Sequence, residues 1–447
     1  MLSLANPQPY RPKCDGVRRR EFMQVGSLAL GGLTLPHLLQ ARAAAAASGQ
    51  PVRNTSVILL FLDGGAPQHE TFDPKLDAPR EYRSFFGSTQ TRTPGVHFGS
   101  HFQRLATQTH RMSILRTLTH GDGDHGGATH WMKTGQPWPP EFFGKAPTIP
   151  QQHPSIGSAL ARVRGPVNTA TGVPNYVRVL SNHGGFPGDD GAWLGQAYSP
   201  LRIGQSRENP MLADMTLRVG TERLADRRSL LRQFDTFNRQ LDTSGTAAAL
   251  DSFHQQALDV VLGRARSAFD LSQEPQSVRD RYGPGLGQEL LLARRLCEAG
   301  AGFVTLNNGY WDFHDGLAPG CNNLCPPLDQ AVAAFLDDVQ SRGLENDILL
   351  VVTGEFGRSP RISGGPGRDH WAPLNCALLI GGGLRMGQVV GESDSRGGYP
   401  RSRPIRPGDL FATVFHVLGI DPRIQFTHPS GRPVYMLEEG RPIEEVL

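Results

Sequence analysis

Short, nearly uninterrupted apolar runs recur along the chain, and each ends in glycine or polar residues. The clearest are residues 56–62, apolar after Ser56, and residues 348–352, apolar throughout. Continuous runs of this length are typical of strands that are covered on both faces, as in parallel sheets. Further strands are predicted at 112–116, 176–180, 303–306 and 376–380.

Between these runs, apolar residues spaced three and four positions apart predict helices. The expected helices are 101–111, 128–134, 155–164, 287–298, 328–342 and 408–418. Residues 205–270 are rich in Arg, Leu and Gln with helical spacing, which predicts a helical insertion on the sheet. The alternation predicts an α/β fold, a mostly parallel sheet sandwiched between helices, in one domain at 48–447. Residues 421–447 are expected to form irregular covering structure.

The first 47 residues have the features of an export signal. Arg18-Arg19-Arg20-Glu21-Phe22-Met23 contains the Arg-Arg-x-Phe-hydrophobic form of a twin-arginine signal. The apolar segment 25–39 that follows is interrupted by Pro36 and is shorter than the ~20 residues of a spanning helix. We therefore expect recognition by the twin-arginine export machinery, a periplasmic or secreted location, and no stable membrane span in the mature protein.

Composition narrows the classes of partner. The 447 residues carry a formal net charge of +3, with no long basic run beyond the N-terminus, which argues against nucleic acid. Cys321 and Cys325 lie four apart in a Gly-, Asn- and Pro-rich stretch that reads as a loop. No second such pair exists for a zinc knuckle. Either a local disulfide or two free thiols is expected there.

Residues that can bind metal follow several predicted strands. Asp63 directly follows the first strand, Asp312 and His314 follow a later one, and Glu355 follows the strand at 348–352. Open α/β sheets place their chemistry at such strand ends, and carboxylates and imidazoles are common metal ligands. At each place an ordinary polar turn is the alternative.

A second group of titratable residues lies between residues 120 and 130. Three histidines and two aspartates, separated mainly by glycines, fall within these eleven residues: His120, Asp122, Asp124, His125 and His130. Such a group can converge on one centre, although a polar surface loop is the alternative. Arg368, Asp369 and His370 follow a later Gly- and Pro-rich loop. They add a cation, a carboxylate and an imidazole to the candidate site.

Together these segments resemble domain-of-unknown-function family 1501, which is placed in the alkaline phosphatase and sulfatase superfamily. The resemblance covers roughly residues 55–435. It rests on six phrases in order: Leu62-Asp63-Gly-Gly, Thr71-Phe-Asp-Pro-Lys75, Leu292-Ala-Arg-Arg-Leu-Cys-Glu-Ala-Gly300, Trp311-Asp-x-His314, Thr353-Gly-Glu-Phe-Gly-Arg358 and Gly367-Arg-Asp-His-Trp371. It implies an alkaline phosphatase-like parallel sheet between helices, with one or two metal ions at the strand ends.

The resemblance also implies ligand roles for particular residues. The metal ligands that it suggests are Asp63, Asp312, His314, Glu355 and His370, with Asp369 as a neighbouring candidate. Phe356 stands where the superfamily carries a ligating histidine. The mixed carboxylate and imidazole set favours Zn²⁺ or Mn²⁺ and admits Mg²⁺ or Ca²⁺.

One departure concerns the nucleophile. In the superfamily a Ser, Thr or Cys lies about ten residues before a Thr-Gly pair, and counting back from Thr134 leads to His125. Thr129 is the nearest hydroxyl. His125 can therefore act as a ligand, a base or a nucleophile.

Two functional hypotheses follow. The first is an exported metal-dependent hydrolase of phosphate or sulfate esters, such as those of phosphorylated or sulfated glycans, with His125 in the catalytic role and Arg358 or Arg368 binding the anionic oxygens. The second is a non-catalytic exported protein on the same scaffold that binds an anionic glycan or a protein partner. The missing hydroxyl favours the second hypothesis, and the retained carboxylates and histidines favour the first. A phosphomutase or transferase is a further enzymatic alternative.

Overall fold

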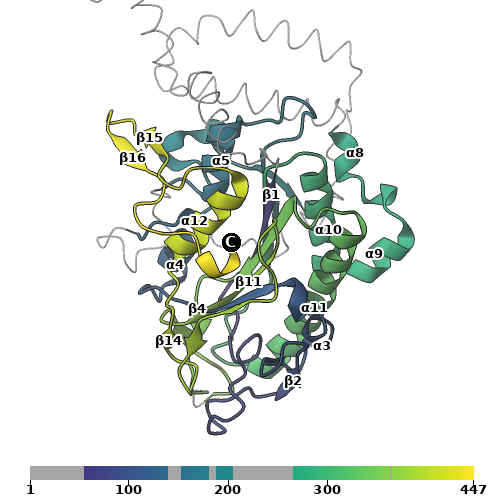
Figure 1. The fold of residues 1–447 in the computed structure, drawn as a ribbon, viewed down its shortest axis with the longest axis vertical. Coiled ribbons are helices and arrows are strands. Elements are labelled where there is room, and N and C mark those ends of the chain that lie inside the picture. Colours follow the sequence, from purple (N-terminus) through teal and green to yellow (C-terminus); the bar gives the residue numbers. More distant parts are fainter. Residues whose placement is uncertain (1–54, 139–152, 181–187, 205–264, 363–364) are drawn as a thin grey trace, which may run out of the picture.

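The computed structural model describes residues 55–138, 153–180, 188–204, 265–362 and 365–447. Its centre is an eight-stranded sheet with the strand order β12-β4-β11-β8-β1-β7-β5-β6 (Figure 1). The strands are β1 (Ser56–Leu62), β4 (Ser113–Leu118), β5 (Tyr176–Leu180), β6 (Leu201–Gly204), β7 (Phe303–Asn308), β8 (Ile348–Thr353), β11 (Asn375–Gly381) and β12 (Val389–Val390). All six predicted strands are therefore present in one sheet.

The pairing brings several chain segments to one edge of the sheet. β1 pairs in parallel with β7 and β8, β5 pairs in parallel with β6 and β7, and β12 pairs in parallel with β4. β11 is antiparallel to both β8 and β4. The carboxyl ends of β1, β4, β7 and β8 and the amino end of β11 consequently lie at the same edge. The predicted mostly parallel sheet is confirmed.

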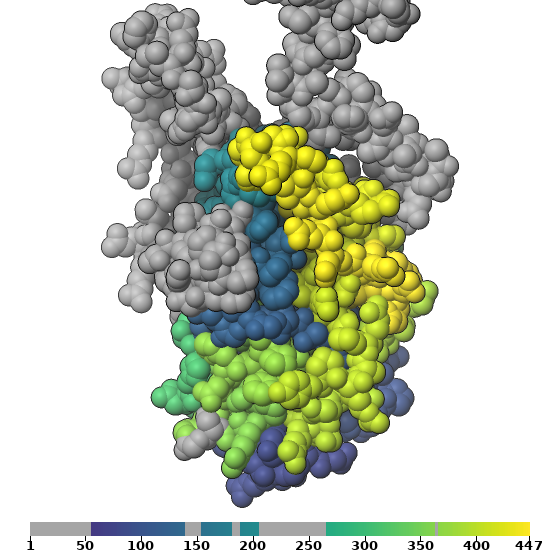
Figure 2. Space-filling model, turned by 90° about the vertical axis from the view of Figure 1, so that its left-hand side faces the viewer, coloured from purple at the N-terminus to yellow at the C-terminus, as the bar shows by residue number. Residues whose placement is uncertain are grey.

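Helices cover both faces of the sheet (Figure 1). One face packs against α9 (Gln276–Tyr282), α10 (Leu286–Glu298) and α11 (Leu317–Ser341), and the other against α4 (His125–Thr134), α5 (Ile156–Arg164) and α12 (Pro407–Leu418). Alternate residues of β1 belong to two different hydrophobic clusters, so the strand is apolar throughout because neither face meets water. Figure 2 shows one side of the molecule, where blue surface lies beside the yellow C-terminal segment.

The start of α11 differs from the prediction. The helix begins at Leu317 rather than at residue 328, so Cys321 and Cys325 lie inside it rather than in a loop. Both are fully buried free thiols, so of the two expected alternatives the structure shows free thiols and not a local disulfide. The prolines at 326 and 327 suggested a loop, but Leu317, Cys321 and Cys325 form a buried stripe at helical spacing.

The predicted helix at 101–111 is also corrected. The structure has only α3 (Gln103–Ala106) and a 3₁₀ turn, Thr109–Arg111. The Asp329 carboxylate of α11 accepts hydrogen bonds from the backbone N–H groups of Arg104 and Leu105 at 3.0 and 2.8 Å. The Asp329 side chain thus caps the start of α3 by binding its free N–H groups. Because Asp329 is far from α3 in the sequence, local spacing could not indicate this cap.

Smaller elements complete the described chain. They are β2 (Ser88–Gln90), β3 (His97–Gly99), α8 (Arg266–Phe269), β9 (Gly357–Arg358), β10 (His370–Trp371), β13 (Glu392–Ser393), β14 (Pro400–Ser402), β15 (Gln425–Thr427), β16 (Pro433–Tyr435) and 3₁₀ turns at Ala192–Leu194, Gln196–Tyr198, Leu271–Gln273 and Glu444–Val446. The predicted signal at 1–47 and most of the predicted insertion at 205–270 lie outside the described residues. Within the described residues, no helix combines the length and apolar character needed to cross a membrane.

Candidate metal centre

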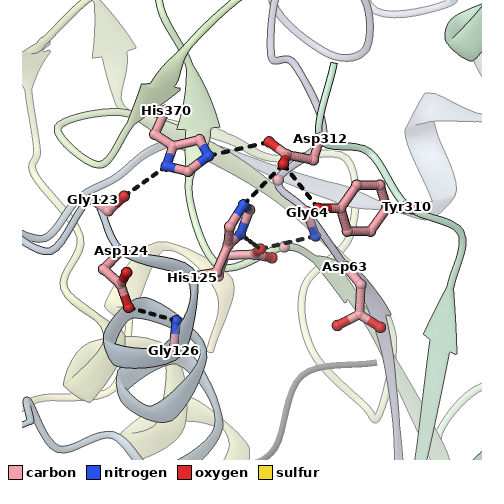
Figure 3. A network of polar contacts seen from close by, with 12 residues as sticks. Asp63, Gly64, Gly123, Asp124, His125, Gly126, Tyr310, Asp312 and His370 are labelled. Atoms are coloured by element: carbon pink, nitrogen blue, oxygen red, sulfur yellow. Dashed lines mark hydrogen bonds and ion pairs between the residues drawn. The ribbon is translucent and has the colours of Figure 1, made fainter. Parts of the chain in front are cut away.

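The shared sheet edge gathers a compact group of polar residues (Figure 3). Asp312 follows β7, Glu355 follows β8, and His370 precedes β11. His125 is the first residue of α4, which lies on one face of the sheet. These four side chains come from four different segments, so the fold rather than local sequence brings them together.

The Asp312 carboxylate is the centre of the group. Its Oδ1 lies 3.1 Å from Nε2 of His370 and 3.1 Å from Nε2 of His314, and it also accepts a hydrogen bond from Arg358. Its Oδ2 lies 3.3 Å from Nε2 of His125. Burial alone would raise the pKa of Asp312, but hydrogen bonds from His125, His370 and Arg358 hold it far below its usual value.

His125 and His370 present the same ring nitrogen to Asp312. Nδ1 of His125 lies 2.6 Å from Glu355 Oε1, and Nδ1 of His370 lies 2.8 Å from the carbonyl oxygen of Gly123. Both neighbours are acceptors, so each Nδ1 carries the proton and donates it. The Nε2 atoms are therefore directed at Asp312, and an Nδ1 held by an oxygen acceptor is the arrangement that metal-binding histidines adopt.

His314 repeats this arrangement at the rim. Its Nδ1 lies 2.9 Å from Asp369 Oδ1, and its Nε2 lies 3.0 Å from Nε2 of His370. When both Nδ1 protons are donated, neither Nε2 atom carries a proton to share with the other. A cation between them resolves this conflict. Asp369, whose side chain is 62% exposed, thus orients His314 rather than entering the group itself.

The group fits a divalent metal. Ligand atoms of His125, Asp312 and His370 all lie within 4.8 Å of one another. Oε2 of the adjacent Glu355 is buried and accepts no hydrogen bond from the described residues. A buried carboxylate oxygen without a donor is costly unless a cation lies nearby. Several imidazoles with a carboxylate suit Zn²⁺ or Mn²⁺ better than Mg²⁺.

His125 is strongly influenced by its two carboxylate neighbours. Burial alone would lower its pKa, but hydrogen bonds to Asp312 and Glu355, together with their charges, raise it to about 9. In the metal-free protein at neutral pH the ring is therefore an imidazolium that bridges the two carboxylates. A metal that binds to Nε2 takes the place of that proton.

The start of α4 aims His125 at the group. Asp124 is the N-cap, and its Oδ1 accepts from the N–H groups of Gly126 and Gly127 at 2.9 and 3.4 Å. A Cβ at Gly127 would come within 1.9 Å of Asp122 Oδ2, so a larger residue would displace the Asp122 carboxylate. Asp122 in turn accepts from the Asp124 N–H at 2.9 Å. These two aspartates build the helix start instead of joining the group.

The other two histidines of this segment are structural. His120 Nε2 lies 2.5 Å from the carbonyl oxygen of Glu355, and burial lowers the pKa of His120 to about 4. His130 stacks on Trp138, with its pKa lowered to about 3 chiefly by burial. Of the five titratable residues predicted there, His125 alone belongs to the convergent group.

Gly64 lets two strand-end loops approach closely. Its N–H donates to Glu355 Oε1 at 2.8 Å, and its φ is +98°. A Cβ would come within 2.7 Å of the backbone nitrogens of Trp311 and Asp312. The glycine that follows Asp63 in the sequence is therefore required for the carboxylates of Asp312 and Glu355 to come together.

Arg358 and Arg368 direct their guanidinium groups mainly at acceptors within the protein. Arg358 is fully buried and donates to the carbonyl oxygens of Gly64, Gly65 and Arg368 and to Asp312. Arg368, also fully buried, donates to Glu70 at 3.0 and 3.3 Å and to backbone carbonyls. The predicted role of these arginines as anion clamps stays a prediction, and most of their N–H groups already have protein acceptors.

Asp63 lies beside the group, with its carboxylate directed away from His125 and Asp312 (Figure 3). Its Oδ2 accepts a hydrogen bond from Asn307 Nδ2 at 2.5 Å. Burial raises its pKa to about 7, and the positive charge of Lys133 opposes this rise. The structure thus places the first predicted ligand next to, but not within, the three-residue group.

Phe356 forms an apolar wall against the imidazoles. The ring is fully buried in a small cluster with Ala128 and Ala372. Its centroid lies 5.0 Å from that of His125 and 4.6 Å from that of His370. Phe356 therefore restricts both rings without binding metal, and it shields one side of the centre from water.

Three supporting residues were not predicted from the sequence. Tyr310 donates to Asp312 Oδ2 at 3.0 Å and is 50% exposed, so its hydroxyl lies at the mouth of the centre. Asn307 contacts Asp63, and Lys133 acts on it electrostatically. The pairing of β1 with β7 places Asn307 near Asp63, so a correct strand alignment would have indicated this contact.

Comparisons with known proteins gave one family and several solved structures. A family model described as "Protein of unknown function (DUF1501)" matches residues 54–447. No curated protein matches. Similar solved structures include a sulfatase from Pseudoalteromonas sp., with 12% identity, coverage of 87% of this chain and 73% of that one, and a TM-score of 0.38. An alkaline phosphatase from the Antarctic bacterium TAB5 has 12% identity, 83% and 100% coverage, and a TM-score of 0.39. A lipoteichoic acid synthase from Listeria monocytogenes has 10% identity, 88% and 76% coverage, and a TM-score of 0.38.

Proposed function

We propose that this chain, which belongs to the DUF1501 family, is a metal-dependent hydrolase of anionic esters. The observation that carries the proposal is the convergence of three imidazole Nε2 atoms on the Asp312 carboxylate, each ring held through Nδ1 by an oxygen acceptor. Three imidazoles from separate segments that meet at one carboxylate, with a second buried carboxylate beside them, form a donor set that suits a divalent cation.

The residues that would hold the ion are His125, Asp312 and His370, with His314 at the rim. When bound, a divalent ion polarises an ester and lowers the pKa of a water molecule toward ~7. Around it, Glu355 fixes the orientation of His125, and Arg358 fixes Asp312. Phe356 excludes water from one side, which strengthens electrostatic interactions within the centre.

His125 acts in this proposal as a ligand. Its Nδ1 is held by a fully buried carboxylate and its Nε2 is directed at Asp312, so neither nitrogen faces an approaching ester. The start of α4 supplies no hydroxyl or thiol: Thr129 is the nearest, one turn into the helix and fully buried. We therefore assign the attack on the ester to water. Its oxygen joins the phosphorus or sulfur, and the alcohol leaves with a proton.

The substrate class we assign is a phosphate or sulfate ester met outside the cytoplasm, with phosphorylated and sulfated glycans as the leading examples. The twin-arginine signal at the N-terminus supports this location. Replacing Arg19 and Arg20 with lysine tests it. We expect the variant to accumulate in the cytoplasm, and continued export would contradict the assignment.

A non-catalytic binding protein is the second candidate. It is favoured by the absence of a hydroxyl or thiol at the start of α4 and by the engaged guanidinium groups of Arg358 and Arg368. On this alternative the ion would serve to bind an anionic glycan or a protein partner without turnover. The two candidates share the metal centre and differ in whether an ester is cleaved.

The deciding experiment measures turnover on a panel of aryl phosphates, phosphodiesters and aryl sulfates. The exported protein is stripped of metal and reloaded with Zn²⁺ or Mn²⁺. Hydrolysis should depend on the ion and be lost in the His125→Ala variant. His416→Ala removes an exposed histidine of α12 and is the matched control. Metal binding without turnover on any substrate class would support the binding protein, and failure to bind metal would end both accounts.

A further inference from the structure

The phrase Thr71-Phe-Asp-Pro-Lys75, which lies outside the metal centre, contributes two residues to another group of charges. Lys75 Nζ lies 3.3 Å from Asp73 Oδ2, and Arg116 Nη1 lies 3.8 Å from Asp73 Oδ1. Ser393 Oγ also donates a hydrogen bond to Asp73 Oδ2. The side chains of Lys75 and Arg116 are 15% and 16% exposed, so both cations are largely shielded but still reach the surface. The group combines two cations with one anion.

Arg116 is poorly paired for an arginine with so little exposure. Within the described parts of the chain, its guanidinium makes no hydrogen bond, and its Nε is buried without an acceptor. Its distance of 3.8 Å to Asp73 is longer than a hydrogen bond. Arg358, by contrast, donates to three backbone carbonyls and to Asp312. Because an arginine carries five N–H donors and burial without acceptors is costly, Arg116 has unused capacity to bind an anion.

An irregularity in the sheet gives Arg116 its direction. Leu115 pairs with Ala377 of β11, and Leu118 pairs with Asn375. Between these two pairs β4 has two residues and β11 has one, so the extra residue of β4 lies at Arg116 or directly after it. Such a bulge re-aims a side chain and is common beside functional sites. Arg116 is also the one residue of β4 that is not buried, which agrees with a side chain turned out of the core.

Lys75 is held in an unusual backbone conformation. Its φ of +50° lies in the left-handed region, which residues other than glycine rarely adopt. Its Nζ donates to the carbonyl oxygen of Ser393 at 3.3 Å, and this bond fixes the ammonium on the same carboxylate that Arg116 faces. Backbone strain of this kind is found where the surrounding structure positions a functional side chain.

The loop after β13 connects this group with the metal centre. Gly397 of the loop packs against Lys75, since a Cβ on the glycine would come within 3.2 Å of Lys75 Cγ. The next residue, Gly398, accepts a hydrogen bond through its carbonyl oxygen from Trp371 Nε1 at 2.6 Å. Trp371 directly follows His370 of the metal centre. The charge group therefore lies beside the metal centre and shares no residue with it.

We propose that Arg116 and Lys75 bind a tetrahedral oxyanion, a phosphate or sulfate group, at a site of its own beside the metal centre. The planar guanidinium matches two oxygens of such a group, and the ammonium adds a point charge. Asp73 holds both cations in position and leaves them a formal charge of +1. The anion is either a free inorganic ion or an ester group on a sugar, because both present the same oxygens. The inference goes beyond the proposed function, since this site needs neither the metal ion nor ester cleavage.

Calorimetric titration of the metal-free exported chain tests the site directly. The probes are inorganic sulfate, inorganic phosphate, galactose 6-sulfate and glucose 6-phosphate, with galactose as the uncharged control. We expect one anion to bind per chain, and Arg116→Gln should weaken this binding by roughly tenfold or more. Arg423→Gln removes an arginine whose side chain is 86% exposed, and this matched control should bind as the wild type does. Absence of binding by all four anions, or equal affinity in the wild type and Arg116→Gln, would overturn the inference.

The same titrations distinguish the two sources of the anion. Equal affinity for the free ions and the sugar esters would assign the site to an inorganic anion, whereas tighter binding of the sugar esters would assign it to a charged group on a glycan. Either result supports the site. A chain that binds these anions but no metal would retain this inference and end the proposed function, so the two failures are distinguishable.

Lys75→Gln provides a second variant, which keeps the inference testable if the substitution at Arg116 prevents folding. Thermal unfolding of the metal-free protein is compared in sodium sulfate and in sodium chloride of the same ionic strength. An anion that binds the folded state raises the unfolding temperature, so sulfate should stabilise the wild type more than Lys75→Gln. An equal increase in both proteins would show that sulfate acts only through its general exclusion from protein surfaces, and it would overturn the inference.

Discussion

His314 and His370 face each other through their Nε2 atoms, which lie 3.0 Å apart at the edge of the sheet. Each ring is oriented by an acceptor at Nδ1, Asp369 in one case and the Gly123 carbonyl in the other. In neutral rings that donate their Nδ1 protons, two Nε2 lone pairs meet at this distance, and a shared cation would satisfy both. The proposed metal centre would account for this contact.

Asp369 should therefore affect metal binding although it is not a ligand. In the Asp369→Asn variant His314 loses the anionic acceptor that orients it, and we expect metal affinity to fall by ~10–100-fold. Asp315→Asn is the matched control, because Asp315 is also exposed and lies one residue beyond His314. Competition titration with a chromogenic chelator gives both affinities. Equal affinities in the two variants would contradict the orienting role.

The stability of the metal-free protein should depend on pH through His125. Its pKa in the folded protein is about 9, above the ordinary value of 6.5, because its carboxylate partners outweigh burial. The stabilisation is fully present below pH 6.5 and is lost as pH rises toward 9. After solvent screening we expect a loss of the order of 1 kcal/mol. Thermal unfolding of wild type and His125→Gln from pH 6 to 9 should show this dependence only in the wild type.

Metal binding should release a proton from the same group. Below pH 9 the His125 imidazolium must lose its proton before Nε2 can bind an ion. Apparent affinity should therefore increase as pH rises from 7 to 9. Calorimetric titrations at pH 7.5 in buffers of different ionisation enthalpy measure the proton count directly. Binding without proton release would show that His125 Nε2 does not contact the ion.

Substitutions of Arg358 and Arg368 should differ in their effect on metal affinity, although both should lower stability. Arg358 bonds to Asp312 and to two carbonyls of the Gly64–Gly65 turn, whereas Arg368 bonds to Glu70. We expect Arg358→Lys to weaken both folding and metal binding, since lysine cannot reach all these acceptors. Arg368→Met should lower stability by about 3–5 kcal/mol by leaving the buried Glu70 carboxylate without its cation, with unchanged metal affinity. Chemical denaturation and metal titration of both variants decide this.

Phe356 should contribute to stability and to metal binding through the packing of its ring. Phe356→Ala removes a fully buried ring that contacts His125 and His370, and such changes destabilise proteins by about 3–5 kcal/mol. The freed space should also loosen both imidazoles and weaken metal binding. Phe356→Leu retains most of the volume and should be milder in both respects. Similar metal affinities in wild type and the alanine variant would show that the ring does not position the ligands.

Sequence patterns predicted the sheet well because β1 is apolar after Ser56 and β8 is apolar up to Thr353, a signal that needs no tertiary information. They failed at α11, where internal prolines concealed a stripe formed by Leu317, Cys321 and Cys325. Burial by neighbouring helices outweighs the local preference of proline there. The pattern could not have shown where the helix begins.

In the site, too, local sequence indicated some residues, whereas others depend on contacts that only folding creates. Asp312, His370 and His125 were identifiable because they follow or precede recognisable elements and are unusual residue types in glycine-rich segments. The directions of the Arg358 and Arg368 side chains could not be predicted, because the local sequence does not decide whether a guanidinium faces a ligand or a backbone carbonyl. Lys133 was missed because its partner Asp189 lies 56 residues later and only folding brings them together.

The most direct test of the account is the metal content of the exported protein, compared between wild type and Asp312→Asn after equilibration with Zn²⁺ or Mn²⁺ and removal of free ion. Asp312 contacts all three imidazoles, so its amide variant keeps the shape of the centre while removing its charge. The account predicts one tightly bound ion in the wild type and almost none in the variant. A wild-type protein without bound metal, or a variant that retains it fully, would contradict the account.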